Sequence, residues 1–204
     1  FSVEKAYTDL YSLVIQQPYI EKFEILSDKN IPDAIDLALW RNRWNGLNNE
    51  TGCHFQCWSE IMSDTYKFAI PNEYKWIYTH TNEIFKDKIV IHRSVYHHNT
   101  NFSWIKILSE IKDVLFLCTD NKREWDEFEF KNDNIQPYYV STIEEMAVVI
   151  NSCKMFIGNQ SAPFAIASAL DVPRLVELDS HPSKFYMDEN KYSKNISWYL
   201  NDNV

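Results

Sequence analysis

The feature that most constrains the fold of this chain is a regular alternation of short apolar runs and amphipathic runs between residues 88 and 178. Each apolar run is short, and polar residues follow it within a few positions. These runs predict strands at 88–94, 113–120, 135–140, 154–158 and 173–178, separated by helices at 101–111, 121–130, 141–152 and 163–170. Strands that alternate with helices over short connections are typical of a parallel sheet covered by helices on its faces. The sequence therefore predicts an α/β, Rossmann-like fold from about residue 86 onward.

Several details refine this prediction. Pro137 cannot donate a backbone hydrogen bond, which indicates an edge position for the third strand. Ser141 and Glu144 stand in capping-box register at the start of the third helix. In the first helix the apolar spacing predicts an inward-facing set made of Trp104, Ile105, Leu108 and Ile111.

The residues before 86 show a weaker pattern. Residues 2–17 have helical spacing, residues 18–26 alternate like a strand, and residues 54–68 place aromatic residues on one face of a helix. We therefore predict two parts. Residues 1–85 form a partial N-terminal α/β portion with a crossover, and residues 86–204 form the Rossmann-like domain. The chain opens at Phe1 rather than Met, which suggests a piece of a longer gene product.

Composition excludes several classes of function. A hydrophobic content of 45% is ample for a packed core, and a net charge of −9 argues against binding nucleic acid through bulk electrostatics. No run of eighteen apolar residues is present, so no transmembrane segment is expected. The four cysteines do not have the spacing of a small disulfide protein, and we expect reduced thiols in a cytoplasmic protein.

One junction carries most of the functional information. The run "KMFI" ends at Gly158, one of only three glycines, and Asn159, Gln160 and Ser161 follow it directly before a helix with Pro163 in its first turn. Ser161 is a suitable N-cap, and Gly158 would allow a sharp turn and a close approach of ligand to backbone. A helix N-terminus that follows a strand in this way is suited to bind phosphate. A strand followed by Gly and a Ser-capped helix is also a common connection in α/β domains that bind no ligand there.

The stretch "FIGNQSAPFAIASALDVPRLVEL" resembles the signature of the heptosyltransferase family of GT-B glycosyltransferases. In that family a strand ends in a Gly–Asn–Asp–Ser/Thr–Gly–Pro type turn, followed by a helix and a Val–Pro strand. "KIVIHRS" and "STIEEMAVVINSCKMFIG" resemble the segments that precede this signature. The resemblance covers about residues 88–178, and implies that residues 86–204 are a donor-binding domain.

The resemblance also implies roles for individual residues. The donor-binding turn, which holds the diphosphate and part of the sugar of a nucleotide-sugar donor, falls on Gly158, Asn159, Gln160, Ser161 and Ala162. Arg93 and Ser94 would face the diphosphate from the loop after the first strand. Asp120, at the end of the second strand, would contact the nucleoside through a ribose hydroxyl. Apart from the resemblance, Glu177 at the end of the last strand could meet a ligand hydroxyl of the nucleoside or equally mark the rim of the sheet.

Three departures from the family pattern stand out. The family usually has Asp where this chain has Gln160, Gly where it has Ala162, and His where it has Ala165. Gln keeps hydrogen bonding but loses charge, so the donor sugar could differ or activity could be lost. The portion before residue 86 is too short for a full N-terminal domain, which supplies the catalytic carboxylate in this family. The catalytic residues of this chain are therefore unknown.

The implied function is metal-independent transfer of a sugar, with inversion, from a nucleotide diphosphate sugar to a saccharide or glycolipid acceptor, with no cofactor. A second hypothesis is a non-catalytic GT-B-derived domain that binds a nucleotide or a protein. A third is an epimerase of similar shape that changes the sugar without an acceptor.

Two other clusters raise metal binding as an alternative. His92, His97 and His98 are close in sequence, but a strand end that runs into a loop does not favour the converging geometry of a zinc site. Phosphate contact or a solvated loop is the better interpretation there, and Arg93 is the better phosphate ligand because guanidinium binds phosphate through two hydrogen bonds. Cys53 and Cys57 lie one helical turn apart beside aromatic residues, which favours core packing over metal ligation.

Overall fold

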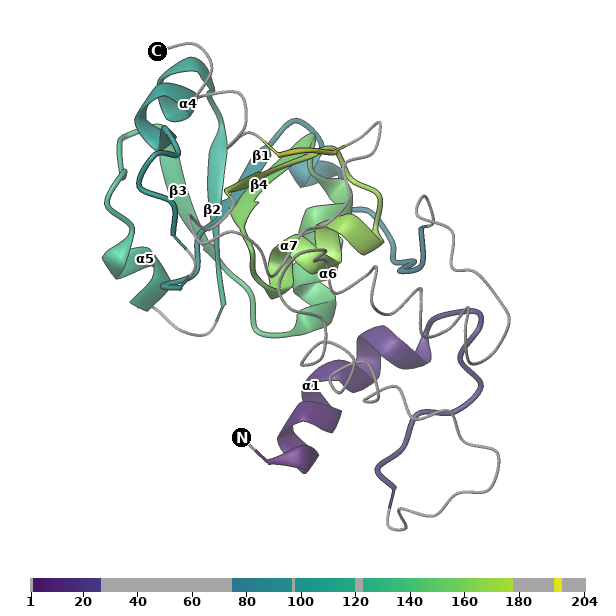
Figure 1. The fold of residues 1–204 in the computed structure, drawn as a ribbon. Coiled ribbons are helices and arrows are strands. Elements are labelled where there is room, and N and C mark those ends of the chain that lie inside the picture. Colours follow the sequence, from purple (N-terminus) through teal and green to yellow (C-terminus); the bar gives the residue numbers. More distant parts are fainter. Residues whose placement is uncertain (1, 27–74, 97, 120–122, 178–192, 196–204) are drawn as a thin grey trace, which may run out of the picture. The chain divides into compact units, whose positions relative to one another are not determined.

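A computed structural model describes residues 2–26, 75–96, 98–119, 123–177 and 193–195 of the 204-residue chain. Its centre is a parallel sheet with the strand order β3-β2-β1-β4-β5-β6 (Figure 1). The fold is therefore α/β and Rossmann-like, as the sequence predicts. Compactness divides the chain into a unit of residues 1–25, 75–180 and 190–204, which holds the sheet, and a second unit of residues 26–74 and 181–189.

The central strands form because their apolar runs can be buried on both faces. The strands are β1 (Ile89–His92), β2 (Val114–Cys118), β3 (Ile135–Tyr139), β4 (Met155–Asn159), β5 (Arg174–Glu177) and β6 (Ser193–Asn195). In β1, β2 and β4 nearly every side chain is buried, which is typical of a parallel sheet with helices on both faces. β3 exposes three of its five side chains, and it lies at the edge predicted from Pro137. The sixth strand was not predicted.

The helices lie on both faces of the sheet (Figure 1). α4 (Trp104–Glu110) and α5 (Arg123–Glu127) connect β1 to β2 and β2 to β3. α6 (Ile143–Ser152) and α7 (Ala162–Ala169) connect β3 to β4 and β4 to β5, so these crossovers run in the opposite direction along the sheet. Because such crossovers are right-handed, the first pair covers one face and the second pair covers the other.

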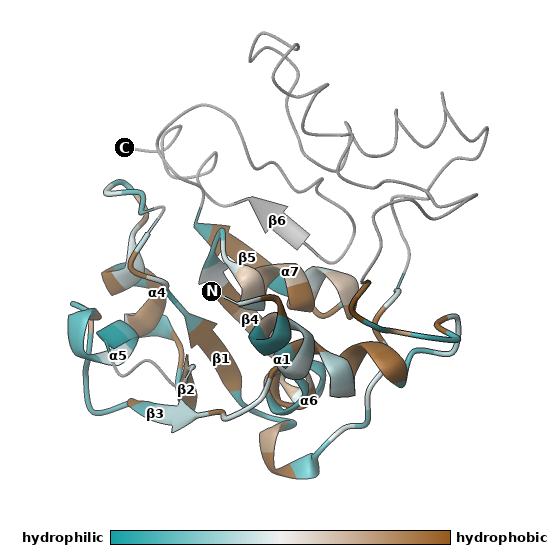
Figure 2. Cartoon of the chain, turned by 90° about the horizontal axis from the view of Figure 1, so that it is seen from below, coloured by the Kyte–Doolittle hydropathy of each residue, from teal (hydrophilic) through white to brown (hydrophobic). Residues whose placement is uncertain are grey.

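The core on the α4 side is unusually aromatic. Trp104, Phe116 and Phe128 are buried together, with the rings of Phe116 and Phe128 centred 4.7 Å apart. These large rings fill the space between the sheet and two short helices, which offer few side chains of their own. The hydropathy colouring in Figure 2 shows the brown residues of β1 and β4 between the helices.

Some local predictions were wrong. Ile105 is 71% exposed, because the short helix α4 directs only Trp104 and Leu108 fully into the core. The cap of α6 lies one residue later than predicted: Thr142 accepts from the backbone N–H of Glu145 at 3.0 Å, and Glu145 accepts from the N–H of Ser141. Residues 18–26 form no strand. The ring of Phe23 stacks instead on Tyr7, whose hydroxyl donates to the carbonyl of Phe23.

The N-terminal helix α1 (Val3–Ile15) is confirmed, and it packs against α6 (Figure 1). The hydroxyl of Ser2 caps it by accepting from the backbone N–H of Lys5. A single turn of 3₁₀-helix, η2 (Glu83–Phe85), precedes β1. The helix predicted at 54–68 lies outside the described residues, and the division at residue 86 stays a prediction.

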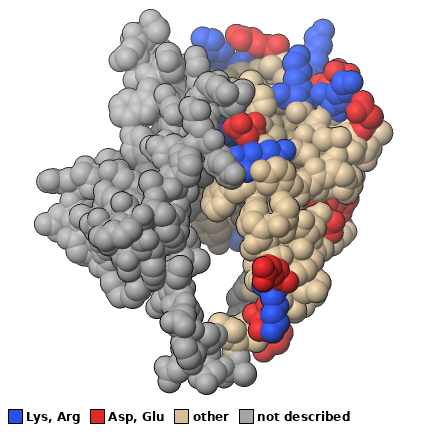
Figure 3. Space-filling model, turned by 90° about the vertical axis from the view of Figure 1, so that its right-hand side faces the viewer, with Lys and Arg blue, Asp and Glu red and all other residues tan. Residues whose placement is uncertain are grey.

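Charged residues of both signs are interspersed on the face drawn in Figure 3. Blue and red groups lie next to one another over the described part of that face. Electrostatic interactions there are therefore short-range pairs rather than one broad field.

Gly158 does not act as the turn residue that the sequence predicts. It lies inside β4, in register with His92 of β1, and no described glycine has a positive φ. A Cβ at this position would lie 2.7 Å from the carbonyl oxygen of His92 and 2.9 Å from the ring of Phe156. Glycine is needed here because the neighbouring strand and the Phe156 ring occupy the space of a side chain.

We therefore expect Gly158→Ala to lower the free energy of unfolding by about 1–3 kcal/mol, since the backbone of β1 or the ring of Phe156 must shift. Urea denaturation followed by circular dichroism measures this change. Lys154→Ala, at an exposed position just before the same strand, is the control and should change stability by less than about 0.5 kcal/mol. Equal midpoints for Gly158→Ala and the wild type would contradict this account of the glycine.

Candidate functional site

The strand order places the candidate site at the carboxyl ends of β1 and β4. The chain winds outward from β1 through β2 to β3, then returns to β4 and continues to β5 on the other side. Connections that leave β1 and β4 in opposite directions create a crevice at their carboxyl ends, where ligands of such sheets bind. Arg93 and Ser94 follow β1, while Asn159, Gln160 and Ser161 end β4 and precede α7. The structure thus brings together two segments that the sequence places about 65 residues apart.

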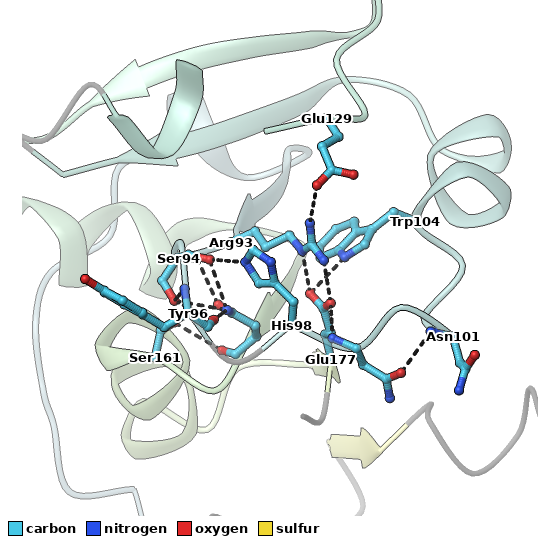
Figure 4. Close-up of polar contacts among 11 residues, drawn as sticks. Arg93, Ser94, Tyr96, His98, Asn101, Trp104, Glu129, Ser161 and Glu177 are labelled. Carbon is cyan, nitrogen blue, oxygen red and sulfur yellow. Dashed lines mark hydrogen bonds and ion pairs between the residues drawn. The ribbon is translucent and has the colours of Figure 1, made fainter. Parts of the chain in front are cut away.

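Asn159 joins these two segments. Its side chain is fully buried, and its Oδ1 accepts from the backbone N–H of Ser94 at 3.0 Å. Its Nδ2 donates to the hydroxyl oxygen of Ser94 at 3.0 Å and to the carbonyl of Tyr96 (Figure 4). Asn159 therefore fixes the loop after β1 to the end of β4, while the ring of Tyr96 stays 66% exposed.

Ser161, the N-cap residue of α7, makes no side-chain cap hydrogen bond. Ser161 has the extended backbone of an N-cap, with φ −144°, but its hydroxyl donates to the carbonyl of Asn159 at 3.1 Å instead of accepting from the helix. Ala162, the first residue of the helix, is exposed, and Gln160 is half-buried. Ser161 therefore leaves the first N–H groups of α7, at the positive end of the helix dipole, without an N-cap hydrogen bond.

Arg93 and Glu177, to which the sequence assigns separate ligand contacts, form a buried ion pair with each other. The Nε and Nη2 of Arg93 donate to the two oxygens of Glu177 at 2.8 and 2.9 Å. Arg93 is 7% exposed and Glu177 is 0% exposed. Two parallel hydrogen bonds between these groups are the strong, geometrically specific form of a salt bridge.

Further contacts complete the surroundings of this pair. Glu177 also accepts from the indole N–H of Trp104 at 2.9 Å and from the backbone N–H of Asn99 at 2.8 Å (Figure 4). The guanidinium of Arg93 lies over the ring of Phe130, 5.4 Å from its centroid. Each charge is therefore compensated inside the protein. Contacts of Arg93 with phosphate and of Glu177 with a ligand hydroxyl stay predictions.

Sequence reasoning missed Trp104 and Asn99 as partners in this network. The inward position of Trp104 was predicted from helical spacing, and a buried indole requires an acceptor for its N–H, so that signal was present. Asn99 contributes only its backbone N–H, and no sequence pattern reports such a contact.

The two described histidines of this segment, His92 and His98, contact different groups. The ring of His92 is buried, with Nδ1 2.9 Å from the carbonyl oxygen of Leu117 and Nε2 3.9 Å from a carboxylate oxygen of Glu124. His98 contacts the carbonyl of Ser94, and His97 lies outside the described residues. Among the described residues, no group of three metal-ligating side chains exists.

Asp120, Cys53 and Cys57 also lie outside the described residues. At the neighbouring end of β2, the carboxylate of Glu124 accepts from the backbone N–H and the hydroxyl of Thr119. The two described cysteines are buried free thiols. Burial raises the pKa of Cys118 and of Cys153 to about 12, so neither thiol is poised to react as a thiolate.

Comparisons with known proteins add little to this geometry. No family model and no curated protein matches the chain. Among solved structures, the chain is similar to the E. coli heptosyltransferase WaaC with ADP, with 14% identity and a TM-score of 0.40. The match covers 60% of this chain and 43% of that one, so the chain spans less than half of the enzyme. Within the described residues, no helix has the length and apolarity needed to cross a bilayer.

We expect Glu177→Gln to lower the free energy of unfolding by about 3–5 kcal/mol, because it leaves the guanidinium of Arg93 buried without a counter-charge. Urea denaturation measures the loss. Glu129→Gln is the matched control: its carboxylate lies 3.9 Å from Nη1 of Arg93 but is 69% exposed, and its removal should cost less than about 0.5 kcal/mol. The double variant Arg93→Gln/Glu177→Gln should be less destabilised than the sum of the single variants. Additive effects would show that the two charges do not interact.

A second prediction concerns pH. Burial lowers the pKa of His92 below its ordinary value, with the nearby Glu124 opposing this effect. The unfolded chain therefore binds a proton near pH 6.5 that the folded protein does not bind. Stability should fall as the pH drops from about 7 to 5.

Denaturation of wild type and His92→Asn across this pH range tests this prediction, since Asn retains a donor for the carbonyl of Leu117. The variant should show a shallower dependence on pH, whereas His80→Asn, at an exposed position, should keep the slope of the wild type. A His92→Asn slope as steep as that of the wild type would contradict the prediction.

Proposed function

We propose that this chain is the donor-binding part of a GT-B-type glycosyltransferase, and that it binds the diphosphate of a nucleotide sugar at the N-terminus of α7. The observation that carries this proposal is the meeting of the loop after β1 with the uncapped start of α7 at the carboxyl ends of β1 and β4. The resemblance of residues 88–178 to the heptosyltransferase signature supports the choice of ligand. The proposed reaction is inverting transfer of the sugar to a saccharide or glycolipid acceptor, without a metal.

The arrangement supports binding through the backbone rather than through a free cation. Arg93 is compensated by Glu177, so attraction for the diphosphate comes mainly from the N–H groups and dipole of α7. The side chains of Ser94 and Ser161 lie at the same edge of the sheet, where their hydroxyls donate to the carbonyls of Tyr96 and Asn159 and would have to exchange these partners for the diphosphate. The backbone N–H groups of α7 would stabilise the negative charge of the diphosphate as it leaves the sugar.

One observation favours a second candidate, a domain that binds a nucleotide or a protein without catalysis. The neutralised Arg93 provides no net charge to stabilise a leaving group, and the family's Asp is replaced here by Gln160. Such a domain would bind a nucleotide diphosphate at the same place and turn over no sugar.

Titration calorimetry of the full chain with ADP, GDP, UDP and CDP tests the proposed site. Ser161→Asp places a carboxylate at the N-cap of α7, where it caps the helix and occupies the anion position. We expect binding to weaken at least about tenfold, which corresponds to about 1.4 kcal/mol, while the melting temperature stays equal or rises.

Ser2→Asp is the matched control, because it makes the same replacement at the N-cap of α1 and should leave nucleotide binding unchanged. Absence of binding by all four nucleotides, or equal binding by Ser161→Asp and the wild type, would refute the site. If a nucleotide binds, product analysis with the corresponding nucleotide sugars and the complete gene product separates the two candidates. Transfer supports the enzyme, and binding without transfer supports the second candidate.

A further inference from the structure

A cavity of about 490 Å³ lies between α1 and the carboxyl ends of β2 and β3. Thr119 follows β2, residues 140–142 follow β3, and residues of α1 form the opposite wall. The cavity shares an edge of the sheet with the start of α7. However, β1 lies between β2, which adjoins the cavity, and β4, and neighbouring strands are about 4.8 Å apart. Its volume falls within the range of small-molecule sites.

The floor of this cavity is aliphatic and its walls carry hydroxyl groups. Leu10, Val140, Ile143 and Met146 provide the apolar surface, and none of the lining residues is aromatic. The hydroxyls come from both sides, namely from Thr8, Ser12, Thr119, Ser141 and Thr142.

These hydroxyls offer both kinds of hydrogen bond. Thr8 donates to the carbonyl of Glu4 at 2.9 Å, and Thr119 donates to Glu124 at 2.9 Å, so each presents lone pairs to the cavity. Thr142 accepts from the backbone N–H of Glu145, which leaves its own O–H to donate. A ligand that suits this mixture must itself donate and accept, as sugar hydroxyls do.

The charges that line the cavity cancel. Lys5 and Asp9, one turn apart on α1, form an ion pair at 2.8 Å with more than two fifths of each side chain exposed. An exposed pair of this kind contributes little stability, so either group can exchange its partner for a ligand hydroxyl. The site therefore favours a neutral ligand over a phosphate.

We propose that this cavity binds a neutral saccharide ring. The aliphatic floor contacts the C–H face of the ring, Asp9 and the hydroxyls of Thr8 and Thr119 accept from its hydroxyls, and Thr142 donates to them. A nucleoside fits less well, because the lining offers its base no aromatic stacking partner. This site goes beyond the proposed nucleotide site and does not depend on it.

Saturation-transfer NMR on the full chain with glucose, galactose, mannose and N-acetylglucosamine, each alone, tests the proposal, with adenosine and uridine as comparison ligands. At least one sugar should give a saturation-transfer signal. Any signal from adenosine or uridine should persist when that sugar is added, because the nucleosides do not bind in this cavity. Asp9→Asn keeps the shape of the wall but removes the charged acceptor, and should weaken binding about tenfold. Ser12→Phe fills the cavity and should abolish the signal.

Glu4→Gln is the matched control, since Glu4 is an exposed carboxylate on the same helix that does not line the cavity, and it should bind like the wild type. Melting curves verify that each variant folds. Loss of binding in Asp9→Asn and Ser12→Phe, with Ser161→Asp unaffected, supports a separate saccharide site.

Three results would overturn the proposal: no signal with any sugar, a signal that survives Ser12→Phe in a folded protein, or a nucleoside that binds here in place of sugars. Failure of Ser161→Asp to affect nucleotide binding would refute only the site at α7.

Discussion

The buried pair of Arg93 and Glu177 is the interaction on which the carboxyl edge of the sheet depends. Arg93 follows β1 and Glu177 ends β5, so the pair spans β4, which lies between them. Charges removed from water at this depth are tolerated only where every donor and acceptor is satisfied. Here Trp104 and the backbone of Asn99 provide the remaining donors, which also fixes the start of α4 and the end of the loop before it.

This requirement explains why the loop after β1 is held so tightly. Glu177 binds it at residues 93 and 99, and Asn159 binds it at residues 94 and 96. Both anchors are fully buried, and they hold residues 93, 94, 96 and 99 in place before a ligand arrives. A site pre-organised in this way can use backbone N–H groups at the start of α7 without a free arginine. In this arrangement Arg93 stabilises the fold through Glu177 and its charge is not available to a ligand.

The two proposed sites lie at the same edge of the sheet but would bind their ligands through different interactions. The start of α7 offers a partial positive charge and backbone donors, which suit an anion. The cavity beside α1 offers cancelled charges, hydroxyls and an aliphatic floor, which suit a neutral ring. β1 lies between them, and so does His92 at its end, where burial lowers the pKa of the imidazole.

The sequence by itself determined α1, the strands β1 to β5 and the order of the helices between those strands, but not β6. Apolar runs such as 114–118 are typical of strands buried on both faces, Pro137 indicated an edge, and Ser161 marked the start of α7. These signals are local, since periodicity and turn chemistry act over a few residues. Only the tertiary structure decided what the site residues contact. Arg93 and Glu177 are 84 positions apart, and Gly158 is needed because of an oxygen on a neighbouring strand. The sequence also did not predict the exposure of Ile105 or the cavity against α1. Both depend on which surfaces of the helices and strands pack together, and strand order and helix length decide this jointly.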